Sequence, residues 1–151
     1  MPSSIHKYLD IFFRDLTTFG GALFYGLVVL LALAFQQTTL AVNLVLGFII
    51  SLAIVVPIRL LYFKNRPQKQ EYSNFLERID AASFPSWHTA RIVFMALTGI
   101  FYFNNTFLTV ISSILALSVC YSRIYLQKHD WMDVLGGIIL AGVTYWIVNL
   151  I

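Results

Sequence analysis

A run without a charged side chain, residues 16–58, limits the kinds of fold open to this chain. It is too long for one buried helix of a soluble domain, and residues 92–122 and 134–151 are also uncharged. A helix crosses the hydrocarbon core of a bilayer with about 20 apolar residues, so the runs have room for several crossings. Charged residues make up 11% of the chain, against ~25% in soluble domains. The sequence therefore predicts an all-α integral membrane protein.

The chain has 151 residues, which leaves room for a single domain, residues 1–151. We expect a helical bundle of about five membrane spans, separated by turn residues and by one long polar segment, residues 64–84. The spans are expected at residues 19–36, 41–63, 85–103, 107–125 and 131–151. Three glycines of the last span, Gly136, Gly137 and Gly142, are expected to allow close helix packing.

Residues 5–16 precede the first span and have a different pattern. Their apolar side chains recur at intervals of three and four residues and alternate with charged ones, which predicts an amphipathic helix. Such a helix lies in the interface of a membrane with its apolar side toward the lipid. We assign His6 to this helix and give it no further role.

The order of the spans brings three polar clusters to the same membrane surface. The second span ends at Arg59 and Arg66, and the third begins at Pro85. The fourth span returns to this surface at Arg123, and the fifth begins there, before Asp133. The two turns at the opposite surface contain Gln, Thr and Asn but no charged residue. This one-sided distribution predicts a functional site.

The arginines of this surface are suited to binding phosphate. Arg59, Arg66 and Arg123 each offer a planar, permanently charged fork that matches phosphate oxygens. Arginines at membrane ends can also extend toward lipid headgroups. Charge near a bilayer is nevertheless costly and usually functional, so we interpret the three as a phosphate site.

Two histidines complete the site. His129 and Asp133 are four residues apart and share a helical face if the last helix begins early enough. The carboxylate would then fix the imidazole tautomer and leave the other nitrogen free to attack phosphorus. Near Pro85, the free N–H groups of Ser86, Trp87 and His88 would form an anion site at a helix N-terminus. His88 could protonate the leaving oxygen and then activate water.

These residues resemble a known family. Arg-x6-Arg-Pro at residues 59–67, Pro-Ser-x-His at 85–88 and Ser-Arg-x5-His-x3-Asp at 122–133 are similar to the three-part signature of the type 2 phosphatidic-acid phosphatase superfamily. The resemblance implies a phosphohistidine at His129, oriented by Asp133, with His88 as general acid. It also implies a phosphate cradle without a metal, made of Arg59, Arg66, Ser86, Trp87 (through its backbone N–H) and Arg123. The family usually has lysine at position 59, and its larger members commonly have six spans.

We therefore expect a hydrolase of membrane lipid phosphates, such as polyprenyl diphosphate, phosphatidic acid or phosphatidylglycerophosphate. Lys64, Lys69 and Arg78 slightly favour contact with a second phosphate or a headgroup. The alternatives are phosphotransfer to an alcohol through the same histidine, and a non-catalytic lipid-binding scaffold. No cofactor is expected, and no carboxylate pair or His-x-x-x-His spacing indicates a metal. The net charge of +3 lacks a basic run, so no nucleic-acid partner is expected.

The two indications of membrane orientation disagree. Apart from the three site arginines, the lysines and arginines also lie on the side of the site. The positive-inside rule then places the site in the cytoplasm. The resemblance to bacterial enzymes that recycle polyprenyl carriers instead implies the outer face.

Overall fold

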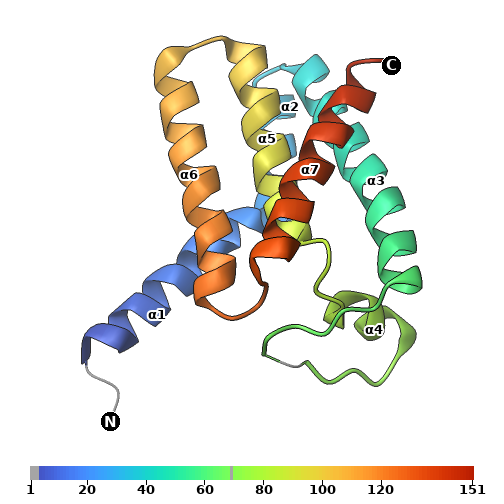
Figure 1. Ribbon diagram of the computed structural model, residues 1–151. Coiled ribbons are helices and arrows are strands. Elements are labelled where there is room, and N and C mark those ends of the chain that lie inside the picture. Colours follow the sequence, from blue (N-terminus) through green and yellow to red (C-terminus); the bar gives the residue numbers. More distant parts are fainter. Residues whose placement is uncertain (1–3, 69) are drawn as a thin grey trace.

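The computed structural model describes residues 4–68 and 70–151, and these ranges contain helices and no strands (Figure 1). The helices are α1 (Ser4–Thr17), η1 (a 3-10 turn, Thr18–Gly20), α2 (Ala22–Ala34), α3 (Thr38–Leu61), α4 (Phe75–Ala81), α5 (Trp87–Phe103), α6 (Thr106–Tyr125) and α7 (Trp131–Val148). The all-α prediction is confirmed. Each predicted span contains one helix, but the predicted count of five membrane spans is not confirmed.

Within the described residues, three helices, α3, α6 and α7, are long and apolar enough to cross a membrane. A fourth crossing results if α1, η1 and α2 form one broken span, whose two parts meet at a bend of 49°. The first predicted span is shortened because the chain turns at η1, so α2 has only 13 residues. At 1.5 Å per residue it is about 20 Å long, less than the ~30 Å hydrocarbon core. Helix α5, with 17 residues, is also shorter than α3, α6 and α7.

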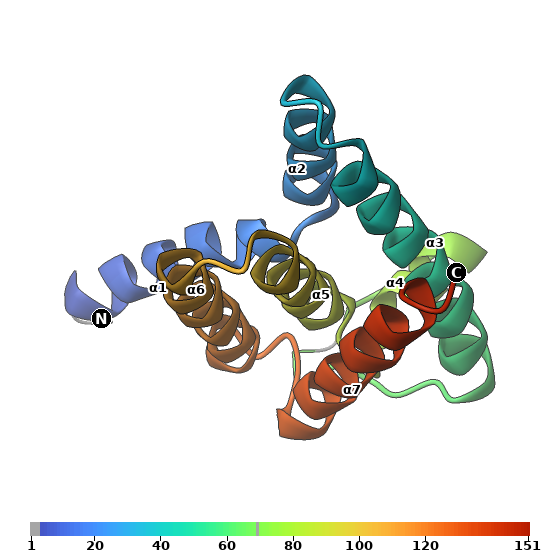
Figure 2. The ribbon, with the colours of Figure 1, turned by 90° about the horizontal axis from the view of Figure 1, so that it is seen from above.

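Helix α5 lies at the centre of the bundle and packs against α7, α6 and α3 (Figures 1 and 2). Helix α2 packs mainly on α3 and lies to one side in the view from above (Figure 2). Because α5 is central, its first turn lies near the ends of several neighbouring helices. This arrangement positions the polar residues described below.

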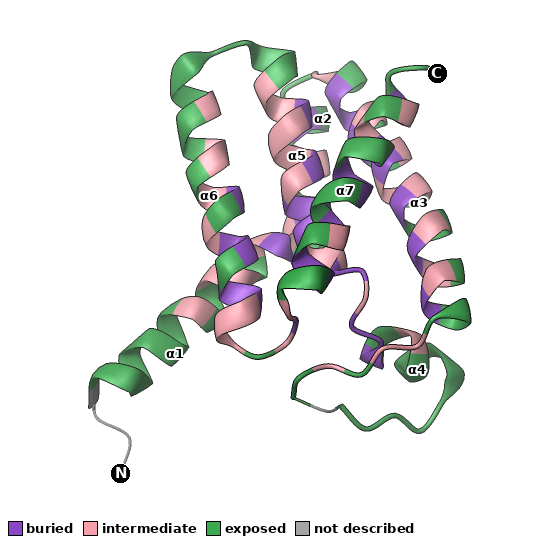
Figure 3. Cartoon of the chain, in the orientation of Figure 1, coloured by how far each residue is buried: buried purple, intermediate pink, exposed green. Residues whose placement is uncertain are grey.

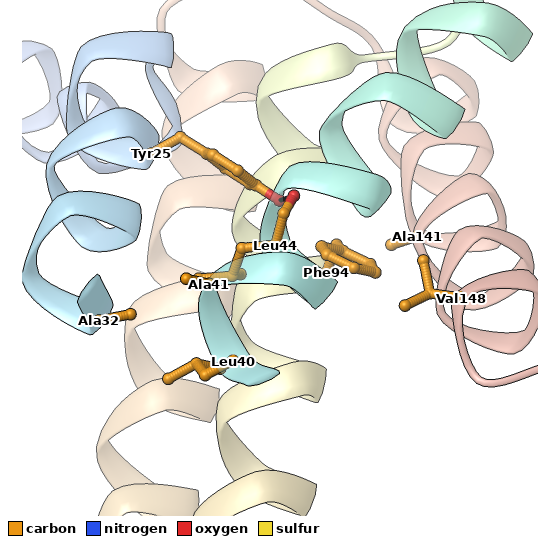
Figure 4. Packing of buried hydrophobic residues seen from close by; sticks show 8 residues of the cluster. All are labelled: Tyr25, Ala32, Leu40, Ala41, Leu44, Phe94, Ala141 and Val148. Atoms are coloured by element: carbon orange, nitrogen blue, oxygen red, sulfur yellow. Dashed lines mark hydrogen bonds between the residues drawn. The ribbon is translucent and has the colours of Figure 1, made fainter. Parts of the chain in front are cut away.

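The largest apolar cluster joins α2, α3, α5 and α7 (Figure 4). Tyr25 is buried there, and its hydroxyl donates to the Leu44 carbonyl at 2.6 Å. Glycine allows close packing at Gly47, where an added Cβ would lie 2.1 Å from the Phe94 ring.

Of the three glycines predicted to allow close packing, Gly136 and Gly137 do so, because an added Cβ would lie 2.5 Å from the Phe84 ring and 2.5 Å from the Ser86 carbonyl oxygen, respectively. The prediction for Gly142 is wrong, since no atom outside its own helix lies within 4 Å of a Cβ built there.

Large apolar side chains on the outside of the bundle remain exposed (Figure 3). Leu23 of α2, Leu117 of α6 and Ile139 of α7 are 93%, 68% and 67% exposed. In water this surface would be costly, whereas hydrocarbon solvates it, as expected of an integral membrane protein.

Helix α1 extends away from the bundle and contacts it only near its C-terminal end (Figure 1). Phe13 packs against Tyr121 and Tyr125 of α6, with ring centroids 5.6 Å and 4.3 Å away. Its apolar residues Ile5 and Tyr8 are exposed. The predicted amphipathic helix is therefore present, and its apolar side is free to face lipid.

Candidate active site

The three predicted polar clusters meet at the end of the bundle where α4 lies (Figure 1). Arg59, Arg123, His129 and Asp133 are buried there, each with 5% or less of its surface exposed. Burial of so many ionisable groups in a membrane protein is costly and usually marks a functional site.

His129 lies in the loop between α6 and α7, and not on α7 as the predicted i, i+4 pairing required. Its backbone N–H donates to the Arg123 carbonyl at 3.1 Å, which folds the loop back under α6. Helix α7 begins at Trp131, after the N-cap Asp130. Ring atom Nδ1 of His129 lies 3.5 Å from Oδ2 of Asp133, so the two side chains are brought together by another route, although no hydrogen bond joins them and Nδ1 is buried without a hydrogen-bond partner among the described residues.

A capping box fixes the position of Asp133. The Asp130 side chain accepts from the Asp133 N–H at 3.0 Å, and Oδ2 of Asp133 accepts from the Asp130 N–H at 3.1 Å. The reciprocal bonds satisfy two of the free donors at the start of α7. The capping box thus holds the Asp133 carboxylate in place independently of His129.

Lys64 joins this carboxylate pair. Its Nζ donates to Asp130 Oδ2 at 2.6 Å and to Asp133 Oδ1 at 2.8 Å. Desolvation alone would lower the pKa of Lys64, but the two carboxylates outweigh it and the pKa is raised. The ammonium therefore neutralises Asp133, whose side chain has no exposed surface. Lys64 is engaged by carboxylates and not free for a second phosphate, and Lys69 lies outside the described residues.

The surroundings of His129 keep its ring neutral. Burial lowers the pKa of His129 to about 4, and the charges of Arg123 and Arg66 add to this effect, although Asp133 opposes it. At neutral pH the ring therefore holds one proton. A proton on Nδ1, on the side of the Asp133 carboxylate, would leave the lone pair on Nε2, which is the form that a nucleophile requires.

The predicted arginines have different partners. Arg59 donates to the carbonyls of Ile79 and Pro85, both at 3.0 Å, and so joins α3 to α4 and to the start of α5. Arg66 donates to Gln70 Oε1 at 2.5 Å and to the Asp80 carbonyl. Arg123 donates to the Thr17 hydroxyl at 2.8 Å, a contact from α1 that the sequence did not indicate.

Helix α4 was not predicted within the polar segment. The Asn74 side chain caps it by accepting from the Glu77 N–H at 2.9 Å. An Asn three residues before a Glu is a known start signal for a helix and could have revealed α4. The helix places the Ile79 and Asp80 carbonyls against the arginines.

The start of α5 differs in one respect from the predicted anion site. Ser86 is the N-cap, and its N–H already donates to the Asp133 carbonyl at 2.9 Å. This N–H therefore ties α5 to α7 and is not available for a phosphate. The N–H groups of Trp87 and His88 have no acceptor among the residues that the structure describes. They remain the free donors of this helix end.

Arg91 belongs to the same cluster and was missed by sequence reasoning. It is 5% exposed, and its Nη2 lies 3.4 Å from Nδ1 of His88. Its guanidinium carbon lies 4.8 Å from the centroid of the Trp87 ring, a cation–π contact. Residues three apart share a helix face, so the spacing from His88 to Arg91 was an available signal.

Four arginines leave a buried donor unused. In the part of the chain that the structure describes, the Nε atoms of Arg59, Arg66, Arg91 and Arg123 have no hydrogen-bond partner. A buried donor without a partner costs about 1–3 kcal/mol. An anion with several oxygens would remove this cost. The described residues contain no group of three or more His, Cys, Asp and Glu that could hold a metal.

Comparison with known proteins gives one family and two structures. The family model described as the PAP2 superfamily matches residues 42–151. The crystal structure of LpxE from Aquifex aeolicus is similar with a TM-score of 0.79 at 22% identity, covering 95% of this chain and 87% of that chain. The crystal structure of the first transmembrane PAP2-type phosphatidylglycerolphosphate phosphatase from Bacillus subtilis is similar with a TM-score of 0.62 at 18% identity. The match covers 94% of this chain and 75% of that chain. At these identities the likeness shows a shared fold.

Proposed function

Since this chain belongs to the PAP2 superfamily, we propose that it is an integral membrane phosphatase that hydrolyses a lipid phosphate. The observation that supports the proposal most is the neutral, buried His129 beside Asp133, within a group of buried arginines. The substrates that we propose are lipid phosphates such as polyprenyl diphosphate, phosphatidic acid and phosphatidylglycerophosphate.

In the proposed reaction, Nε2 of His129 attacks phosphorus and forms an N–P bond. The bond from phosphorus to the lipid oxygen breaks, and His88, protonated beside the bound anionic substrate, gives its proton to that oxygen as general acid. Water then attacks the phosphohistidine, His88 takes one proton from the water, the N–P electrons return to Nε2, and the phosphate leaves with the other proton. Asp133 stabilises the positive imidazole of the intermediate.

The arginines would supply the electrostatic part of catalysis. Phosphoryl transfer depends mainly on positioning and on stabilising the charge of the equatorial oxygens. Arg66 and Arg123 are charged neighbours of both histidines and have unused Nε donors. We propose that they and Arg59 bind the phosphoryl oxygens, with the Trp87 N–H as a further donor, so that no metal is required.

Phosphate release by detergent-purified protein in EDTA tests the proposal. Phosphatidic acid, phosphatidylglycerophosphate and a polyprenyl diphosphate would be compared, with His129→Ala as control. We expect release that falls by at least about 10⁴-fold in the variant, because the nucleophile is lost. Folded protein that releases no phosphate from any substrate would contradict a hydrolase. Transfer of phosphate to an added alcohol would then indicate a transferase, and lipid binding alone a scaffold.

A further inference from the structure

We infer that Thr17, the last residue of α1, is a positioning residue of the phosphate site, because its hydroxyl orients Arg123 without cancelling the charge of the guanidinium. The inference rests on the proposed phosphatase function, in which Arg123 binds a phosphoryl oxygen. It is based on the 2.8 Å hydrogen bond from Nη1 of Arg123 to Oγ1 of Thr17, which joins residues 106 positions apart in the chain.

The contact with Thr17 determines how the Arg123 side chain is oriented. Arg123 lies in the last turn of α6 and is 5% exposed. Among the described residues, Thr17 is the hydrogen-bond partner of its guanidinium, and the buried Nε has no partner. Because the guanidinium is planar, a hydrogen bond at Nη1 also restricts the direction of the Nε–H group. Thr17 therefore helps to hold this free donor in one direction, as a phosphoryl oxygen would require.

The acceptors that hold the arginines of the proposed phosphate site are mainly neutral. Arg59 donates to two backbone carbonyls, and Arg66 donates to a backbone carbonyl and a side-chain amide. The exception is the Asp80 carboxylate, which lies 3.8 Å from Arg66 on a side chain that is 67% exposed. A buried carboxylate would neutralise the positive charge that attracts the phosphate. The Thr17 hydroxyl orients Arg123 and leaves its charge available.

The segment that carries Thr17 is packed firmly against the bundle (Figure 1). Phe13, one turn earlier in α1, packs against two tyrosine rings of α6. After Thr17 the chain turns at η1, where Gly20 is buried against α5. A Cβ added to Gly20 would lie 3.0 Å from the His88 carbonyl oxygen. Thr17 therefore supports the site from a segment that contains none of the predicted site residues.

Orthovanadate binding tests the inference without a choice of lipid, with Kd measured by isothermal titration calorimetry on detergent-purified protein in EDTA. Thr17→Val removes the hydroxyl and keeps a branched side chain. The loss of a hydrogen bond to a charged group changes an equilibrium by about 10- to 100-fold, so we expect Kd to rise at least about tenfold. Thr17→Ser keeps the hydroxyl and should remain within about threefold of wild type.

Thr18→Val is the matched control, because the Thr18 hydroxyl donates to the Asp15 carbonyl at 2.6 Å and not to the site. Its Kd should equal that of wild type. A rise of equal size in Thr17→Val and Thr18→Val would mean that the end of α1 matters as a whole, and would overturn the inference. An unchanged Kd in Thr17→Val, or a Thr17→Ser variant as weak as Thr17→Val, would also overturn it.

A second pair of variants tests the need for a neutral acceptor. Thr17→Asn and Thr17→Asp introduce side chains of the same shape that differ by one negative charge. The carboxylate would offset the charge of Arg123, so Thr17→Asp should bind orthovanadate at least about tenfold more weakly than Thr17→Asn. Equal Kd values for the two variants would contradict the inference.

Arg123→Met separates an effect through Arg123 from an independent role of Thr17. If Thr17 acts through Arg123, adding Thr17→Val to Arg123→Met causes no further rise in Kd. A further rise as large as in the wild-type background would overturn the inference, as would wild-type protein that does not bind orthovanadate. Wild-type protein that binds orthovanadate but releases no phosphate from any lipid would contradict the proposed phosphatase function alone. Weaker binding by Thr17→Val would then still support the positioning role.

Discussion

The two histidines of the site have opposite surroundings. Nδ1 of His129 faces the buried carboxylate of Asp133, whereas Nδ1 of His88 faces the guanidinium of Arg91. The first contact favours a proton on Nδ1 and a lone pair on Nε2, and the second favours the reverse. We propose that the same side chain therefore serves as a nucleophile in one place and as a donor toward the leaving oxygen in the other. The neighbours, and not the residue type, determine the role.

The two histidines also lie in different kinds of local structure, one in a loop and one in a helix. His129 lies in a loop that is closed by the Arg123 carbonyl and followed by the capping box of α7. His88 lies in the first turn of α5, on the helix face that also presents Arg91. The Ser86 N–H, bound to the Asp133 carbonyl, joins the two parts.

Of the variants that keep both histidines, Asp133→Asn should cause the largest loss of activity, because it changes the surroundings of His129 and leaves those of His88 intact. An amide cannot hold the His129 proton on Nδ1 in the same way, and such a change costs about 10⁴-fold in a well-known carboxylate–histidine pair. We expect a loss of at least about 10³-fold in kcat, measured as phosphate release in EDTA.

Asp130→Asn is the matched control, because it makes the same change three residues earlier. Asparagine remains a good N-cap, and the Asp130 side chain is 42% exposed, so the loss should be less than about tenfold. Equal losses for the two variants would mean that Asp133 acts by holding the start of α7 and not through His129.

Gly137→Ala should disturb the contact between α5 and α7 that holds His88 and His129 near each other. An added Cβ would lie 2.5 Å from the Ser86 carbonyl oxygen and 2.9 Å from Thr89 Cβ, so α5 and α7 must move apart. Overpacking of this kind costs about 1–3 kcal/mol, and activity should fall with thermal stability in detergent. Gly142→Ala, with open space at its Cβ, should be neutral or stabilising by up to about 1 kcal/mol. If both variants lose stability equally, helix packing at Gly137 is not the cause.

Much of the fold, and the meeting of the predicted polar clusters at one end of the bundle, could be predicted from the sequence. The uncharged runs predicted the positions of the helices, because hydrocarbon excludes charge. Since successive helices run in opposite directions, Arg59, Ser86 and Asp133 were expected at the same end of the bundle, where the structure places them. The amphipathic pattern of residues 5–16 likewise predicted α1. The break between residues 16 and 19 was expected, whereas the short length of α2, which begins only after η1, was not.

The contacts within the site were harder to predict. Lys64 was considered for a second phosphate, yet its ammonium lies between Asp130 and Asp133, since loop geometry cannot be read from spacing. Arg91 was overlooked because it stands beside a long apolar run, although its spacing from His88 indicated a shared face. The free N–H predicted for Ser86 was wrong because its acceptor lies far along the chain.

The smallest expected change concerns the acid side of the pH profile. In the proposed mechanism His129 attacks as the neutral ring, whose pKa of about 4 predicts that activity falls as pH decreases toward 4. The pKa of Lys64 is raised, so its ammonium keeps its charge throughout this range and offsets Asp133. Lys64→Met removes that charge, which favours protonated His129 and should move the acid midpoint of kcat/KM upward by about 1 pH unit.

Because this shift lies below neutral pH, the rate of Lys64→Met at about pH 7.5 should stay within roughly threefold of wild type. Lys64→Arg keeps the positive charge and serves as the matched control, with an acid midpoint close to that of wild type. A midpoint that moves equally in both variants would point to altered loop packing. An unmoved midpoint in Lys64→Met would show that Lys64 does not act on His129 through Asp133, and the contrast between the two histidines would then rest on Asp133 and Arg91 alone.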